Sequence, residues 1–428
     1  MKLFVFFLFL TITLNTFSSC LEYGIDSSSE NKEKEQTDHS NTDPTDSADN
    51  DYIQDISSNK YQFENEIEIS EGSTQAKKVN PKEREQGLVK LARIKKGTKR
   101  QVVLITGEQN TKVSYINLSE RLGIDSEELY DYVRSDNLKR IKELGTQDQD
   151  GEILVSGLIP PVDGKDVHIC AGLNYRSHQT EMLMANKVLI FPKMGKPTAA
   201  YSDVYLKNRK MFDYELEIGV YVPIDIQKET DLADIPFGFF LANDLTERDV
   251  QVRKFQKGTA AGFALSKSFE GSLPIGPYVV FPIDRKAFLN ALTLELKLNG
   301  KVRQQSHSSL LVSNVDELIK NTFNVERDWE GPNGRVKLIP GDTIAKGTLI
   351  LTGTPGGTIF QVLKTSQKIQ YAFSYFLKAK FLNDLSMVDS IKEEWIRSEI
   401  SSGKYLKNGD IVEATISELG TQKLKIVE

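Results

Sequence analysis

The chain has 428 residues, of which 39% are hydrophobic, and its formal net charge is −6. This length supplies enough apolar residues for one large domain or two ordinary ones. The acidic balance argues against nucleic acid as a partner, because binding to phosphates needs a basic surface. Only two cysteines are present, Cys20 and Cys170, which excludes a disulfide framework if the first of them carries lipid.

The amino terminus has the pattern of an export signal. Lys2 precedes an apolar run over residues 3–14 that is too short to span a bilayer, and small residues at 18 and 19 lead to Cys20. This resembles a bacterial lipoprotein signal, with Phe17 standing where Leu or Val is commoner. We therefore expect a signal peptide over 1–19 and lipidation of Cys20. The mature protein would then be lipid-anchored in the bacterial cell envelope, periplasmic or on the surface; a plain secretory signal is the alternative.

Residues 20–86 are rich in Ser, Asp, Glu, Asn, Lys and Thr and contain little that a core would bury. This composition predicts a disordered acidic tether. Beyond it, two alternating runs around a Gly-containing turn predict a hairpin over residues 100–118. Asp125 with Glu128 three residues later is typical of a helix start, with Leu129 and Val133 on one face.

A Pro/Gly-rich connector over residues 157–167 is a natural domain boundary. We therefore expect a small amino-terminal α+β domain over 87–164 and a catalytic domain over 165–428. Short apolar strands separated by turns dominate the second domain, so its fold class should be α+β and β-rich rather than a doubly wound sheet. No GxGxxG follows a strand and no GxxxxGK[ST] occurs, which excludes the usual dinucleotide and P-loop sites.

The segment DYELEIGV, residues 213–220, alternates as a β-strand does. Its apolar positions share one face, and Asp213, Glu215 and Glu217 share the other. Two carboxylates at i and i+2 repel each other and are costly to bury without a positive partner, for which a divalent cation is the usual choice. An exposed acidic strand face is the alternative. The Gly-rich TGTPGG, residues 352–357, is either a tight turn or a loop that touches substrate.

Seven motifs follow one another in the second half of the chain: GLNYRSHQTE, DYELEIGV, ANDLTERDVQ, SKSFEGSLPIGP, LNGKVRQ, PGD and LTGTPGG. In this order they resemble the fumarylacetoacetate hydrolase superfamily from about Val167 to the carboxyl terminus. The resemblance implies a mixed β-roll, usually dimeric, with a divalent metal site. We therefore expect a homodimer.

The resemblance also assigns roles. The metal ligands fall on Glu215, Glu217 and Asp244, and three oxygen ligands suit Mg²⁺, with Mn²⁺ or Ca²⁺ as alternatives, and disfavour zinc. His178 and Glu181, three residues apart, share one helical face and match the catalytic dyad in which a carboxylate orients an imidazole that deprotonates water.

Further positions match groups that meet the substrate. Lys267 corresponds to the lysine that faces negative charge developing on an oxygen. The matches to ligand-contacting positions are Tyr175, Arg248, Gln251 and Thr354.

The function implied is metal-dependent hydrolysis of a carbon–carbon bond in a β-diketo acid of the fumarylacetoacetate or acylpyruvate kind. Relatives that decarboxylate oxaloacetate or isomerise dienoates share the metal site, so these activities on a dicarbonyl or 2-oxo acid are alternatives. A lipid-anchored binding protein without chemistry is a third alternative.

The chain departs from the family pattern over residues 359–405, where a short turn is usual. Apolar residues there follow helical spacing from Ala372 to Leu385, and Trp395 with Ile396 suggests a second helix. We expect a helical hairpin packed on the domain or at a dimer interface; a lid over the site or a membrane-lying face is the alternative.

Overall fold

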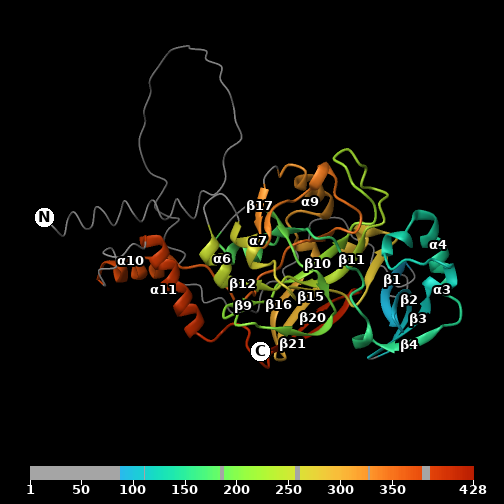
Figure 1. The fold of residues 1–428 in the computed structure, drawn as a ribbon, viewed down its shortest axis with the longest axis horizontal. Helices are drawn as coiled ribbons and strands as arrows, with labels where there is room; N and C mark the ends of the chain where they lie inside the picture. Colours follow the sequence, from blue (N-terminus) through green and yellow to red (C-terminus); the bar gives the residue numbers. More distant parts are fainter. Residues whose placement is uncertain (1–86, 110, 184–187, 256–260, 326–327, 378–385) are drawn as a thin grey trace, which may run out of the picture. The chain divides into compact units, whose positions relative to one another are not determined.

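The computed structural model describes residues 87–428 except 110, 184–187, 256–260, 326–327 and 378–385. The predicted signal peptide, Cys20 and the acidic tether lie outside the described residues. Figure 1 draws this part of the chain as a ribbon and labels many of its helices and strands.

A ten-stranded sheet forms the centre of the fold. Its strands are, in spatial order, β4 (Gly151–Leu154), β3 (Lys112–Asn117), β2 (Lys99–Gln109), β1 (Leu88–Lys96), β14 (Val279–Pro282), β11 (Gly238–Asn243), β10 (Leu216–Tyr221), β19 (Leu349–Leu351), β5 (His168–Gly172) and β6 (Leu189–Lys193). Every residue of β10 and β11 is buried. The sheet therefore places these strands in the core, and the site is built at their ends.

A second sheet has five strands, in the order β16 (Lys301–His307), β15 (Thr293–Leu298), β20 (Ile411–Ile416), β21 (Gly420–Val427) and β8 (Tyr201–Tyr205). Along β15 every second residue is buried, which is the pattern of a strand with one face on the core. Both sheets mix parallel and antiparallel pairs, since β21–β8 and β19–β5 are parallel. The strand-rich α+β fold class predicted from the sequence is confirmed.

The remaining elements are short. The strands are β7 (Pro197–Thr198), β9 (Phe212–Asp213), β12 (Thr246–Glu247), β13 (Leu273–Pro274), β17 (Asp328–Gly331) and β18 (Gly334–Lys337). The helices are α3 (Leu118–Leu122), α4 (Ser135–Leu144), α5 (Arg176–Glu181), α6 (Arg248–Lys254), α7 (Ala261–Ser266), α8 (Arg285–Leu289), α9 (Val315–Thr322), α10 (Thr365–Leu377) and α11 (Met387–Ser401), with 3₁₀ turns η1 (Leu129–Asp131), η2 (Val155–Gly157), η3 (Ser308–Leu310) and η4 (Pro340–Asp342).

The amino-terminal strands continue the large sheet, because β1 pairs antiparallel with β14. The predicted hairpin is present as β2 and β3. The helix predicted to start at Asp125 was wrong, since this stretch contains only η1, and Glu128 makes no side-chain capping bond. The Tyr132 hydroxyl lies 3.0 Å from the Ile124 carbonyl and 2.7 Å from the Ser126 carbonyl, so a buried side chain holds this backbone in a non-helical path.

Residues 359–405, where the sequence departs from the family pattern, contain α10 and α11, and these two helices pack against each other. Ala372 of α10 and Ile391 of α11 share a small apolar cluster with Leu363. Phe381, Leu382 and Leu385, which belong to the predicted helical pattern, lie outside the described residues. Among the described residues, none of the helices has the length and apolar character that crossing a bilayer requires.

His168 of β5 is fully buried, and its Nε2 lies 3.0 Å from the Gly195 carbonyl. Burial lowers the pKa of His168 to about 4, against about 6.5 in an unfolded chain. Between these two values the unfolded state binds more protons than the folded state. The free energy of unfolding should therefore fall as the pH falls through this window.

The variant His168→Gln keeps a polar side chain at this position but does not titrate. Between pH 7 and pH 5, wild-type protein should lose about 2 kcal/mol more of its free energy of unfolding than this variant does. Urea unfolding at the two pH values measures the difference. Equal losses in the two proteins would contradict a neutral, buried His168.

Candidate active site and metal centre

Three carboxylates meet at the ends of the two central strands. Glu215 immediately precedes β10, Glu217 lies within it and Asp244 follows β11. One oxygen from each lies within 4.8 Å of the others, and all three side chains are buried. Glu215 is 5% exposed and Glu217 2% exposed, so an exposed acidic strand face, the alternative drawn from the sequence, is excluded.

The local backbone explains how Glu215 reaches this cluster. The sequence predicted one unbroken strand over residues 213–220, and this was wrong, because β9 ends at Asp213 and β10 begins at Leu216. The amide of Glu215 donates to Asn243 Oδ1 (3.1 Å), and that of Leu216 donates to Gln304 Oε1 (3.0 Å). Side-chain acceptors thus replace ladder partners at the point where the strand is interrupted.

Buried cations compensate two of the carboxylates. Lys267 Nζ lies 2.6 Å from Glu215 Oε2 and 2.7 Å from Asp244 Oδ2. Burial by itself would raise the pKa of Glu215, but Lys267 and Arg248 outweigh it and lower that pKa to about 2. Glu215 is therefore ionised at neutral pH.

Glu217 is the carboxylate that the cations compensate least. Burial, together with the charges of Asp244 and Glu215, raises its pKa well above the usual range. Its Oε2 accepts a hydrogen bond from the Gly353 amide at 2.7 Å. A third carboxylate so close to two others is the arrangement that a divalent cation stabilises.

The donor set fits a hard divalent ion. It consists of carboxylate oxygens, without the imidazole or thiolate ligands that zinc prefers. Asp244 Oδ2 accepts no well-directed hydrogen bond, although Lys267 lies beside it. Glu215, Glu217 and Asp244 would hold such an ion.

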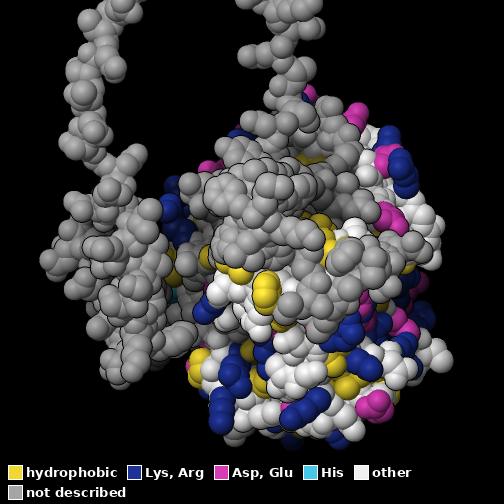
Figure 2. Space-filling view, turned by 90° about the vertical axis from the view of Figure 1, so that its left-hand side faces the viewer, with side chains coloured by type: hydrophobic (Ala, Val, Ile, Leu, Met, Phe, Trp, Pro, Cys, Tyr) yellow, Lys and Arg dark blue, Asp and Glu magenta, His cyan; other side chains and the backbone are white. Residues whose placement is uncertain are grey.

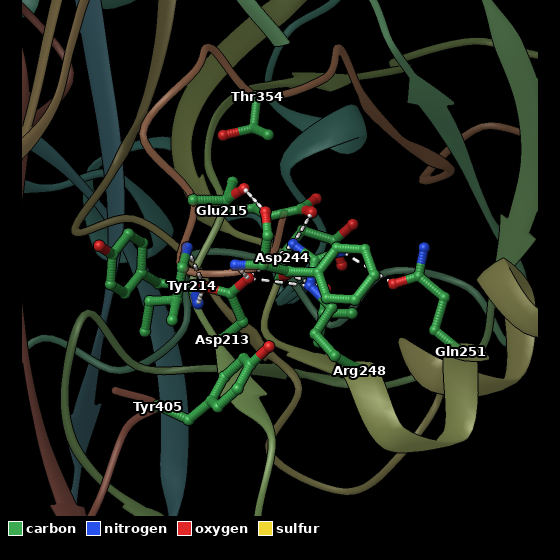
Figure 3. A network of polar contacts seen from close by, with 12 residues as sticks. Asp213, Tyr214, Glu215, Asp244, Arg248, Gln251, Thr354 and Tyr405 are labelled. Carbon is green, nitrogen blue, oxygen red and sulfur yellow. Dashed lines mark hydrogen bonds and ion pairs between the residues drawn. The ribbon is translucent and has the colours of Figure 1, made fainter. Parts of the chain in front are cut away.

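Arg248, at the start of α6, is surrounded by acceptors (Figure 3). Its Nε donates to Asp213 Oδ2 (2.8 Å), and one terminal nitrogen donates to Glu215 Oε1 (2.5 Å). The other terminal nitrogen donates to Gln251 Oε1 (2.9 Å). Because the Gln251 carbonyl faces the guanidinium, its amide NH₂ is the end left for a ligand, and Figure 3 shows that end directed away from Arg248.

His178 and Glu181 both lie on α5, one helical turn apart. His178 Nδ1 is 3.4 Å from Glu181 Oε2. A proton on Nδ1 donates toward this carboxylate and leaves Nε2 as the acceptor, which is the tautomer that a general base requires. The other Glu181 oxygen accepts the Gly357 amide at 2.8 Å, so the carboxylate is itself held in place.

The Gly-rich loop, residues 352–357, hydrogen-bonds both to β10, which carries Glu217, and to α5, which carries Glu181. Gly353 donates to Glu217 at 2.7 Å, while Gly357 donates to Glu181 at 2.8 Å. Thr354 Oγ1 donates to the Leu216 carbonyl at 3.0 Å. Gly357 has a φ of +99°, and a Cβ there would lie 2.0 Å from the Arg303 carbonyl oxygen, so only glycine fits.

A pocket opens over these groups. Its polar lining is His178, Glu215, Arg248, Gln251, Lys267 and Thr354, and its apolar lining is Ala171, Gly172, Leu173, Met182, Phe191 and Phe263. Glu217, Asp244 and Tyr175 do not belong to this lining. Tyr175 is 1% exposed, and its hydroxyl has no hydrogen-bond partner among the described residues. Burial and the nearby Glu217 raise the pKa of this phenol.

Sequence reasoning missed Lys193 at the end of β6. Its ammonium lies in the fully buried interior, 2.7 Å from Asp244 Oδ1 and 3.1 Å from the Ser272 carbonyl. A lysine inside the apolar run LIFPK was the available signal, because a buried lysine needs a charged partner. Asp213 was noted only as part of an acidic face, whereas it forms an ion pair with Arg248.

Comparison with known proteins agrees with this geometry. Residues 167–427 match the family described as fumarylacetoacetate (FAA) hydrolase C-terminal. An uncharacterised protein of Methanocaldococcus jannaschii is 31% identical over 188 residues, which cover 42% of this chain and 70% of that protein. The oxaloacetate tautomerase YisK of Bacillus subtilis is 30% identical over 207 residues, which cover 46% of this chain and 60% of YisK.

Solved structures share the fold. The fumarylacetoacetate hydrolase of Exiguobacterium antarcticum superposes with a TM-score of 0.52 at 19% identity, over 79% of this chain and 99% of that one. A putative HpcE protein of Mycobacterium smegmatis gives the same TM-score at 20% identity, over 80% of this chain and 100% of that one. With the family match over more than half of its length, the chain belongs to the fumarylacetoacetate hydrolase family.

Proposed function

We propose that the protein is a divalent-metal-dependent hydrolase that cleaves a carbon–carbon bond in a β-diketo acid of the fumarylacetoacetate or acylpyruvate kind. The observation that carries this proposal is that His178, whose Nδ1 faces Glu181, lines one pocket with Lys267 and with Glu215 of the carboxylate cluster. Mg²⁺ is the ion we propose, and Mn²⁺ or Ca²⁺ would suit the same oxygen ligands.

An ion held by Glu215, Glu217 and Asp244 would supply a Lewis acid for the oxygens of a 1,3-dicarbonyl or 2-oxo acid. The chain's own residues perform the proton transfers. His178 Nε2 takes a proton from water, and Glu181 stabilises the imidazolium that forms. The water oxygen bonds to a carbonyl carbon of the substrate.

The bond between this carbon and the neighbouring α-carbon then breaks. Its electron pair moves onto the enolate of the leaving fragment, where the Lys267 ammonium faces the negative charge. The α-carbon takes a proton from the His178 imidazolium, and two acids leave. The Gln251 amide NH₂ orients the substrate in the pocket, and Thr354 forms part of the wall that the substrate meets.

A second candidate is tautomerisation of oxaloacetate, which the 30% identity to YisK favours. This reaction moves a proton between carbon and oxygen and needs no addition of water. The same dyad serves it, with His178 carrying the proton. Decarboxylation of oxaloacetate and isomerisation of a dienoate use the same pocket without water addition.

Purified full-length protein supplied with Mg²⁺ or Mn²⁺ tests the proposal against acylpyruvates and oxaloacetate. Release of pyruvate together with a second carboxylic acid supports the hydrolase. Faster conversion between enol and keto oxaloacetate without fragmentation favours the tautomerase instead. If no substrate is turned over but ligands still bind, a binding protein becomes the better account.

We also propose that the mature chain is anchored through lipid on Cys20, on the basis of Lys2 and the short apolar run. Stable anchoring takes more than one acyl chain, because a single chain binds a membrane only marginally. The variant Cys20→Ser should move from the membrane to the soluble fraction after cell lysis, as followed by immunoblotting. Wild-type protein that is already soluble and uncleaved would contradict the lipoprotein assignment.

A homodimer is our proposal for the assembled state, because family members are usually dimeric. Light scattering on the eluting peak of a sizing column would measure the mass of the particle. Twice the mass of one chain supports the dimer, and the mass of a single chain contradicts it.

A further inference from the structure

The inserted segment, residues 359–405, is attached to α6, the helix that carries Arg248 and Gln251. Lys392 of α11 donates at 2.8 Å to the carbonyl of Phe255, the capping residue that follows α6. An ion pair between Arg253 and Glu393 joins the two helices at a second point. Polar contacts therefore fix α11 along α6 and at its carboxyl end.

An apolar cluster, which we call the insertion cluster, contains side chains of both α11 and α6. Its buried members are Leu173, Met182, Met211, Val252, Phe360, Ile396 and Tyr405, with Trp395 packed against them. Leu173 and Met182 also line the pocket, and Val252 belongs to α6. One packed group of side chains thus touches α11, α6 and the wall of the site.

Phe360 is a member whose ring packs against the polar network. Its ring centroid lies 5.2 Å from the Arg248 guanidinium carbon and 5.4 Å from the Trp395 ring. Its backbone amide donates to Asp213 Oδ2 at 3.1 Å, the same oxygen that accepts from Arg248 Nε. Phe360 therefore packs against Arg248 through its ring and hydrogen-bonds through its backbone to Asp213, which is paired with Arg248.

We propose that the insertion positions the substrate-facing groups of α6, with Trp395 and Phe360 as the positioning residues. Trp395 holds the Phe360 ring, this ring packs on the Arg248 guanidinium, and Arg248 fixes the Gln251 carbonyl so that its amide NH₂ faces the substrate. This inference rests on the proposed function, in which Gln251 orients the substrate. Close-packed side chains pass displacements to their neighbours, so a void beside Phe360 should move this donor.

Two of the three metal ligands are held from other elements, and the third, Glu215, is held by Lys267 and through its amide by Asn243 as well as by Arg248. Glu217 is fixed by Gly353, and Asp244 by Lys193 and Lys267. Truncating a side chain of the insertion cluster should therefore weaken substrate binding and leave the affinity for the ion unchanged. If Trp395 had only a structural role, its replacement would lower the stability of the protein without weakening substrate binding selectively over ion binding.

The test is the variant Trp395→Ala in the full-length chain. We expect KM to rise roughly tenfold, with kcat changed much less, because uniform binding of the substrate is lost. The Mn²⁺ dissociation constant from calorimetry should stay at the wild-type value. Trp395→Phe should restore most of the wild-type KM.

A matched control truncates an aromatic residue on the exposed side of the same hairpin. Phe373 of α10 is 48% exposed, near other exposed apolar residues such as Ile369. Figure 2 shows hydrophobic side chains on the side of the molecule that includes this hairpin. Phe373→Ala should leave KM, kcat and Mn²⁺ affinity unchanged.

A second variant and a binding measurement test the same inference. Phe360→Leu retains apolar volume but removes the ring from Arg248, so it serves if Trp395→Ala does not fold, and its KM should rise in the same way. Binding of oxalate, a chelating dianion, to Mn²⁺-loaded protein should weaken roughly tenfold in either variant. This binding can be measured even if wild-type protein turns over no substrate. Absence of turnover would contradict the proposed function but would leave the positioning role of the insertion to be decided by oxalate binding. Unchanged KM and unchanged oxalate affinity in folded variants would overturn the inference.

Discussion

Replacing Glu217 by alanine is expected to abolish binding of the divalent ion at micromolar to millimolar concentrations, and with it the activity. Loss of an outer partner of a metal ligand typically costs 10–100-fold in affinity, so loss of a ligand itself should cost more than roughly 100-fold. The two carboxylates that remain, Glu215 and Asp244, are both paired with Lys267, which competes for the same oxygens. Calorimetric titration with Mn²⁺ and thermal melting with and without the ion measure the effect.

Wild-type protein should gain about 2.7 kcal/mol of stability at an ion concentration of 100 times its dissociation constant. Glu217→Ala should gain nothing. The matched control is Glu413→Ala, which removes a partly exposed glutamate paired with Lys423. Full metal-dependent stabilisation in Glu217→Ala would remove this residue from the proposed ligand set.

Replacing His178 by alanine is expected to slow hydrolysis by roughly 10²–10⁴-fold, the usual contribution of a positioned general base. Glu181→Gln should lower the rate less, since the imidazole stays but loses the carboxylate that orients it. Neither variant touches the three metal ligands, so Mn²⁺ affinity should not change. The measurement is kcat for an acylpyruvate with the ion saturating.

Oxaloacetate decarboxylation, if wild type carries it out, should fall much less in His178→Ala, because breaking that bond does not require activated water. The control is His307→Ala, which removes a histidine whose Nδ1 lies 2.7 Å from the Ser309 hydroxyl and which does not line the pocket. Hydrolysis at the wild-type rate in His178→Ala would exclude the dyad as the base.

The parts of the site that depend on local spacing could be predicted from the sequence. His178 and Glu181 are three residues apart, and a single helical turn brings them together. Glu215 and Glu217 are two apart, which places both near one face of an extended segment. Asp244 entered only through the family resemblance. The pairing of Leu216 with Asn243 across β10 and β11 brings it to the cluster.

The remaining features depend on contacts between distant segments. Whether residues 213–220 form one strand was decided by the side chains of Asn243 and Gln304, which accept the amides of Glu215 and Leu216. No periodicity within the segment carries that information. The loop at Gly353 and Gly357 likewise has partners more than 130 residues away in the sequence, so its role could not be read from its glycines.

Arg248 illustrates the limit of transferring a role by motif. The resemblance assigns it to ligand contact, and it does line the pocket. Its donors, however, are engaged by Asp213, Glu215 and Gln251. Its partner Phe360 comes from the segment in which this chain departs from the family pattern, which is why the sequence motifs gave no sign of the contact.

The most direct test of the proposed metal centre is a crystal structure of the Mn²⁺-loaded protein with an anomalous difference map. We expect one strong peak, coordinated by carboxylate oxygens of Glu215, Glu217 and Asp244 at roughly 2.0–2.6 Å, with Lys267 displaced from at least one of the two carboxylates it pairs with. A map without a peak at these residues at saturating Mn²⁺, or with a peak held by other side chains, would contradict the account.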